Sequence, residues 1–260
     1  MVIAARTETT LSPTITQASL VNAIKTAFFN AGYSSVYDEF VSGTDQILVY
    51  EWVNDSTKNF GKTYLRIRIT TALLIGQQLY TGWNIGTHTG TNGSTEATYS
   101  SFGSSTTILL NALNGAEEYK FVFVSQGTLL VPLGIIAPFD RPGWWDLNSW
   151  AYGFFFTTSS PSSLRGVATA ALPYSSSDFD TFLTNSRMSS VNPQTSKPDI
   201  IKGLLLLTQS SSGVGGATSE DLAIGSFNGQ TRLSIVSPVN SGQEYLVVSN
   251  VAGGLGVRIA

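Results

Sequence analysis

The amino-acid sequence predicts a mainly β protein of antiparallel, sandwich-like sheets, with an amino-terminal amphipathic helix and one short insert helix. Segments rich in β-branched and aromatic residues recur along the chain, and three Asn-Gly dipeptides, a pair favoured in tight hairpin turns, separate some of them. One strand-like segment, residues 63–71, has branched apolar side chains at every second position: Leu65, Ile67 and Ile69. This alternation is typical of a half-exposed strand, with Arg66 and Arg68 on its wetter face.

A single clear amphipathic helix is predicted over residues 17–31. Its apolar residues recur at spacings of three and four and so share one stripe: Leu20, Val21, Ile24, Ala27, Phe28 and Ala31. Thr16 is placed to cap the amino end, and Gly32 is placed to adopt the left-handed conformation that ends many helices. The stripe needs a hydrophobic surface, which we expect the following strands, residues 47–53 and 63–71, to supply.

Two of the Asn-Gly dipeptides are predicted to join strands. Residues 114–115 connect "TILLNAL" to "EEYKFVFV", and residues 228–229 connect "AIGSF" to "TRLSIV"; the dipeptide at 92–93 is expected in an exposed loop. In "EEYKFVFV", aromatic side chains occupy one face: Tyr119, Phe121 and Phe123. Val122 and Val124 occupy the other, so both faces of this strand should be covered.

The remaining segments suggest the domain organisation. Residues 178–188 are predicted to form the short insert helix, because Ser and Asp residues at their start suit a helix amino end. Residues 210–219, "SSSGVGGATS", are predicted to be a flexible segment of low charge. We therefore expect an amino-terminal extension over 1–16, a mainly β core domain over 17–209, and a carboxyl-terminal β segment over 220–260 that packs on the core.

Composition excludes several classes of function. The net charge is −3, and the scattered basic residues argue against nucleic acid as a partner. With no Cys, neither disulfides nor thiolate chemistry are available. Charged residues make up 12% of the chain, where about 25% is usual, so Ser, Thr, Asn, Gln and Gly must form much of the surface. Such a surface tolerates close packing against other protein. The amino terminus does not look like a signal peptide, and the apolar runs are too short to span a bilayer, so no membrane insertion is expected.

No catalytic, cofactor-binding or metal-binding residue is predicted. The single histidine, His88, lies in a Thr/Gly-rich stretch and is expected to be an exposed loop residue, because a zinc site needs more than one such ligand. No G-x-S-x-G nucleophile motif is present. Asp140 and Asp146 flank an aromatic segment, as carboxylates of a glycosidase would, but capping of the turn or ion pairing with Arg141 is the preferred explanation. We therefore expect a protein that is not an enzyme.

An aromatic block, "RPGWWDLNSWAYGFFF" at residues 141–156, supplies the candidate contact residues Trp144, Trp145, Trp150 and Tyr152. Large aromatic side chains dominate protein cores and interfaces, and they also stack on sugar rings. On a strand the adjacent Trp144 and Trp145 would point to opposite sides, so they would not form one flat platform. Three interpretations stay open: a core plug, a subunit interface and a glycan contact.

Three phrases carry a resemblance to a known class of protein: the segment from "LVYEWVNDSTKNF" to "GQQLYTGWN", the block "RPGWWDLNSWAYGFF" and "NPQTSKPDI". Across residues 35–201 the chain resembles virion structural proteins of tailed bacteriophages, especially phages of cyanobacteria. The resemblance implies a copy-repeated, non-enzymatic component of the tail, baseplate or fibre region. Such a subunit is made in the host cytoplasm and, in the virion, contacts copies of itself (a homo-oligomer) and other virion proteins. It transfers no functional residues.

Two alternatives accompany that expectation. In the first alternative, the chain is a receptor-binding adhesin that recognises host surface polysaccharide through the aromatic block. The second, a depolymerase of envelope glycan, depends only on scattered Asp and Glu residues and ranks last.

Overall fold

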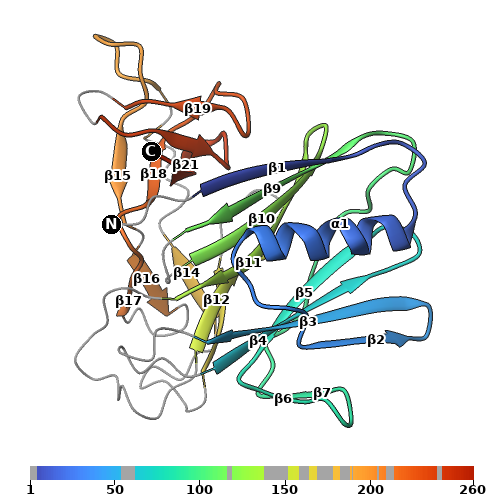
Figure 1. Cartoon of the computed structure of the whole chain (residues 1–260). Helices are drawn as coiled ribbons and strands as arrows, with labels where there is room; N and C mark the ends of the chain where they lie inside the picture. Colours follow the sequence, from blue (N-terminus) through green and yellow to red (C-terminus); the bar gives the residue numbers. More distant parts are fainter. Residues whose placement is uncertain are drawn as a thin grey trace.

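The computed structural model describes residues 5–53, 62–115, 119–137, 152–157, 164–168, 178–181, 188, 190–203, 205–208, 214–238 and 242–260. These residues form four antiparallel sheets and one helix (Figure 1). The predicted class, mainly β with an amino-terminal helix, is confirmed.

The largest sheet, here the central sheet, has nine strands. In spatial order they are β1 (Ala5–Leu11), β9 (Ile108–Asn114), β10 (Tyr119–Gln126), β11 (Leu129–Ile136), β12 (Tyr152–Phe156), β13 (Leu164–Ala168), β14 (Asp178–Thr181), β16 (Leu205–Thr208) and β17 (Val214–Ala217). Every pairing in it is antiparallel, and β9, β10 and β11 are long, neighbouring strands near one end of the sheet.

Three smaller sheets accompany it. The second sheet contains, in order, β2 (Asp38–Ser42), β3 (Asp45–Val53), β4 (Lys62–Ile69), β5 (Ile75–Tyr80) and β8 (Ala97–Thr98). The C-terminal sheet contains β15 (Ile200–Lys202), β18 (Leu222–Ser226), β21 (Ala252–Arg258), β20 (Tyr245–Val247) and β19 (Ile235–Val236). A hairpin of β6 (Gly82–Asn84) and β7 (Thr89–Thr91) forms the fourth.

The helix α1 (Gln17–Asn30) forms as the sequence predicts and has capping interactions at both ends. The Thr16 hydroxyl accepts a hydrogen bond from the Ser19 backbone at 3.1 Å, and the Ser19 hydroxyl oxygen accepts one from the Thr16 backbone at 2.9 Å. At the carboxyl end Gly32 has a φ of +83°, and the next backbone N–H, that of Tyr33, donates to the Phe28 carbonyl at 3.0 Å. The predicted stripe, from Leu20 to Ala31, is buried.

The principal core lies between the central sheet and the second sheet, and α1 packs into it (Figure 1). The helix contributes Leu20, Ile24 and Phe28, and the ring of Phe28 stacks on that of Tyr50 in β3 with centroids 4.3 Å apart. Burial of this apolar area is the main stabilising contribution to the amino-terminal half.

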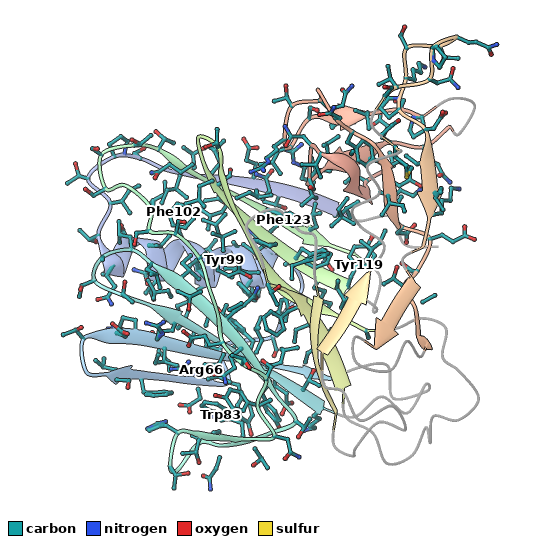
Figure 2. All side chains as sticks on the ribbon, turned by 180° about the vertical axis from the view of Figure 1, so that it is seen from behind. Arg66, Trp83, Tyr99, Phe102, Tyr119 and Phe123 are labelled. Carbon is teal, nitrogen blue, oxygen red and sulfur yellow. The ribbon has the colours of Figure 1, made fainter. Side chains whose placement is uncertain are left out.

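The opposite face of the central sheet is also covered. Aromatic side chains of β10 pack there with residues of the C-terminal sheet: Tyr119, Phe121 and Phe123 with Leu222, Leu246, Leu255 and Val257. Val122 and Val124, on the other face of β10, belong to the principal core. Figure 2 shows Tyr119 and Phe123 directed toward the carboxyl-terminal strands. The prediction that both faces of this strand are covered is therefore correct.

A buried polar group also ties the two sides of the principal core together. The side-chain amide of Gln77 in β5 donates to the carbonyl oxygens of Pro132 and Phe156 at 2.7 and 2.9 Å, and it contacts the Tyr99 hydroxyl. Both carbonyls belong to strands of the central sheet. Because a buried amide is costly without partners, this arrangement fixes how the two sheets stack.

Several expectations for the less regular segments are corrected. Asp178–Thr181, the start of the predicted insert helix, is the strand β14, which pairs with β13 and β16; ladder hydrogen bonds override the local Ser and Asp pattern. The segment 210–219, expected to be flexible, contains the strand β17, and the segment 1–16, expected to be an extension, contains β1 of the central sheet.

The Asn-Gly dipeptides behave in three ways. Residues 114–115 do lie between paired strands, β9 and β10. The dipeptide at 228–229 forms a turn, but its flanking strands are not a hairpin, because β18 pairs with β15 and β21 while β19 pairs with β20. Asn92 and Gly93 are exposed, as expected.

In the part of the chain that the structure describes, no helical segment has the length and apolar character that a membrane span requires.

Candidate functional site

The aromatic block is only partly described. Trp144, Trp145 and Trp150 lie outside the described residues. Tyr152 is the first residue of β12, where its backbone position pairs with Ala168 of β13. The interpretations of this block as core, interface or glycan contact therefore stay predictions.

A different surface concentrates aromatic and charged side chains. It is the distal face, which we define as the face of the second sheet that points away from the central sheet. Figure 2 shows Arg66 and Trp83 on this side of the molecule. Ile47 and Val49 form its apolar floor, and Tyr64 packs with them. The β6–β7 hairpin lies against it, so that Trp83 joins the same cluster.

One half of the distal face is an ion-pair network. Glu96 bridges two arginines of β4: its carboxylate lies 2.8 Å from Nη1 of Arg66 and 3.0 Å from Nε of Arg68. Arg68 also contacts Asp45 of β3, at 3.1 Å. All four side chains are about one-fifth to one-quarter exposed, so the network is screened less than a surface pair. Arg66 and Arg68 occupy the wetter face, as the alternation predicts.

The network changes the pKa of Glu96 and that of Arg68. Burial acts to raise the pKa of Glu96, but the hydrogen bonds and positive charges of Arg68 and Arg66 outweigh burial and lower that pKa below its ordinary value of 4.5. The hydrogen bond with Glu96 raises the pKa of Arg68. Glu96 therefore holds a negative charge that stabilises the fold.

Glu96→Gln is expected to lower the free energy of unfolding by about 1–2 kcal/mol at pH 7, because both arginines lose a charged partner. Since the pKa of Glu96 is lower in the folded state, its stabilising contribution is present above about pH 4.5 and is lost as the pH falls through the folded-state pKa. Urea unfolding at pH 7 and pH 3 should show the variant and the parent converging at acid pH. Glu39→Gln, in an exposed pair with Lys25, is the control and should change stability by less than about 0.5 kcal/mol. A difference for Glu96→Gln that is equal at both pH values would contradict this account.

The other half of the distal face centres on a buried carboxylate. Asp38, at the start of β2, is 6% exposed and accepts a hydrogen bond from the indole N–H of Trp83 at 2.8 Å. Nδ1 of His88 lies 2.9 Å from the same carboxylate oxygen, Oδ2. The His88 ring stacks on Phe40, with centroids 4.2 Å apart. His88 is in a loop and 43% of its side chain is exposed, as predicted, but its bond to Asp38 was not anticipated.

Asp38 orients the imidazole of His88, as a carboxylate does in many catalytic and metal-binding sites. The role of this pair therefore depends on which other side chains lie near the imidazole. Among the described residues no group of three His, Cys, Asp or Glu side chains converges as metal ligands. The hydroxyls of Thr87 and Thr89, in the same hairpin, bond to each other at 2.8 Å. Both side chains that Asp38 binds belong to the β6–β7 segment, so the contacts pin this hairpin to the second sheet.

A shallow groove lies elsewhere, on the face of the central sheet that the C-terminal sheet covers only in part. It has a volume of about 390 Å³ and an apolar floor that includes Leu109, Leu129 and Leu130. Arg6 and Glu8 of β1 and Arg232 stand around it. Arg232 donates to Asn250 at 3.0 Å and to the Thr128 carbonyl at 2.6 Å, so this guanidinium joins the carboxyl-terminal segment to the β10–β11 turn.

The sequence alone contains little that signals the cluster on Asp38. Trp83 and His88 are 45 and 50 residues from Asp38 in the sequence, and only the pairing of β2 with β3 and the folding-back of the hairpin bring them together.

No protein-family model matches the sequence, and no curated protein is detectably similar to it.

Proposed function

We propose that the chain is a non-enzymatic structural component of a tailed-phage virion, in the tail, baseplate or fibre region. It assembles by contacts with copies of itself and with other virion proteins. The resemblance of residues 35–201 and the low share of charged residues, 12%, support the proposal.

The main support for this proposal is that the ionisable side chains of the distal face bind one another. Arg66 and Arg68 both bind the Glu96 carboxylate, and His88 is bound to Asp38. These contacts stiffen the sheet and hold its hairpin. Elsewhere on the surface, large apolar side chains are exposed, among them Phe29 of α1 at 71% and Ile201 of β15 at 58%. A rigid body with apolar contact points is suited to packing against other protein.

Quantitative peptide mass spectrometry of purified virions tests the proposal. We expect the chain in a fixed ratio to the other tail proteins, retained after washing in high salt. Absence of the chain from infectious particles would overturn the proposal, and so would turnover of a substrate by the purified protein that one substitution in an intact fold abolishes.

Recognition of host surface polysaccharide is a second candidate, favoured by the position of Trp83. Trp83 is half-buried, its ring contacts those of Tyr80 and Phe40, and it lies on the same face as the charged network, a combination suited to a sugar's apolar face and hydroxyls. Binding to host polysaccharide that Trp83→Ala abolishes while the fold persists would favour this candidate. Trp83→Phe, which keeps an aromatic face but loses the bond to Asp38, separates stacking from local stability.

A further inference from the structure

The amino-terminal strand β1 has one edge that no strand of the described residues pairs with. It pairs with β9 over seven consecutive residue pairs without a register shift, from Ala5 with Asn114 to Leu11 with Ile108. No described strand pairs with its other side, and Figure 1 shows β1 at the margin of the central sheet. The unpaired N–H and C=O groups of such an edge are a template for another strand.

The β1 edge differs from the other sheet edges of the described chain. With seven residues it is the longest of them; the other terminal strands are β2 with five residues, β17 with four, β15, β6 and β7 with three each, and β8 and β19 with two each. Proteins commonly protect an edge with a short strand, a bulge, Pro or charged side chains, Lys above all. The sequence of β1, ARTETTL, has no Pro or Lys, and the strand pairs with β9 without a bulge. Its two charged residues, Arg6 and Glu8, have opposite signs, and three Thr residues give it good β propensity.

The charged residues of β1 favour one register for the pairing of β1 with the β1 strand of a second copy. Arg6 and Glu8 lie on the same face of the strand, with Thr7 between them. In an antiparallel pair of two copies related by a two-fold axis at Thr7, Arg6 of each copy lies opposite Glu8 of the other. An axis at Arg6 or at Glu8 would instead place two like charges directly opposite each other, which is destabilising.

The present contacts of Arg6 and Glu8 are compatible with ion pairs between two copies. Nε of Arg6 donates to the side chain of Asn111, in the neighbouring strand β9, at 2.8 Å. Its Nη2 contacts Glu8 of the same strand at 3.0 Å, and the Glu8 side chain is 46% exposed. A second strand at the edge, in the register centred on Thr7, would place another Glu8 directly opposite Arg6.

We propose that two copies of the chain join through β1, antiparallel and with Thr7 on the two-fold axis, so that their central sheets become continuous. The proposal rests on the proposed function, since it names the contact between copies in an assembled particle. A strand pair of this length buries less area than a stable dimer needs, so the contact is weak in dilute solution and becomes effective at the high local concentration of an assembly.

A cysteine at the axis tests the register. The chain has no Cys, so Thr7→Cys introduces the only thiol. Opposed residues of an antiparallel pair have Cα atoms about 4.5–5.5 Å apart, within the range for a disulfide. Thr10→Cys is the matched control, because its thiols would be six residues, or roughly 20 Å, apart. Under mild oxidation we expect a covalent dimer from Thr7→Cys at least about tenfold faster than from Thr10→Cys. Equal rates, or no dimer from Thr7→Cys, would overturn the proposal.

Charge exchange in the Thr7→Cys background tests the ion pairs. Arg6→Glu alone and Glu8→Arg alone each place like charges opposite each other and should slow the crosslink about tenfold. Mixed in equal amounts, the two variants should form a heterodimer at the rate of the Thr7→Cys parent, because every opposed pair is again complementary. Thermal unfolding confirms that each variant is folded. Failure of the mixture to restore the rate would contradict this register. A chain that is present in virions but stays uncrosslinked would overturn this inference and leave the proposed function intact.

Discussion

Phe121→Ala is expected to lower the free energy of unfolding by about 3–5 kcal/mol, because it leaves a cavity where the central and C-terminal sheets meet. Phe121 is 1% exposed, and its ring lies 5.4–5.8 Å, centroid to centroid, from those of Tyr119, Phe123 and Phe156. These side chains belong to two strands of one face, so the cavity has little freedom to collapse. Urea unfolding followed by tryptophan fluorescence measures the change.

Phe29→Ala is the matched control. The same truncation at a side chain that is 71% exposed should change stability by no more than about 0.5 kcal/mol. If Phe121→Ala had an effect as small as that of Phe29→Ala, the second covered face of the central sheet would not be part of the cooperative fold.

Gly134→Ala is expected to destabilise the protein by about 3 kcal/mol or more, for two independent reasons. Gly134 has a φ of +128°, in a region that side-chain-bearing residues rarely adopt, which costs about 1–3 kcal/mol. A Cβ there would lie 2.1 Å from the backbone oxygen of Lys120 in β10, so the strands would have to separate. Loss of soluble protein or a lower denaturation midpoint are the expected readouts.

Gly127→Ala separates the two causes. Gly127 also has a positive φ, +57°, but nothing lies within 4 Å of the added Cβ, so we expect a loss of only about 1–2 kcal/mol. Equal effects at both positions would mean that β10 and β11 do not approach as closely as the register of Phe121 with Gly134 requires.

Periodicity predicted the elements whose contacts repeat along the chain. Alternation in residues 63–71 correctly placed Arg66 and Arg68 on one face, and the double-sided pattern of residues 119–124 correctly required two layers of cover. The helix was predictable because its stripe, cap and terminal glycine are all local features. Each of these signals lies within a window of about fifteen residues.

Long-range pairing decided the rest. Local signals at Asp178 favour a helix, but the pairing of Phe179 with Thr208 of β16 stabilises a strand instead. Glu96 is 28 residues from Arg68, and His88 is 50 residues from Asp38, so neither partner was visible from spacing alone. Likewise, the open edge of β1 follows from its place at the end of the central sheet, which its sequence does not specify.

Electron cryo-microscopy of purified virions tests the central claim most directly. The account predicts density that fits the central, second and C-terminal sheets in repeated copies in the tail, baseplate or fibre, in contact with other virion proteins. Particles that are complete and infectious without any copy of the chain would contradict it.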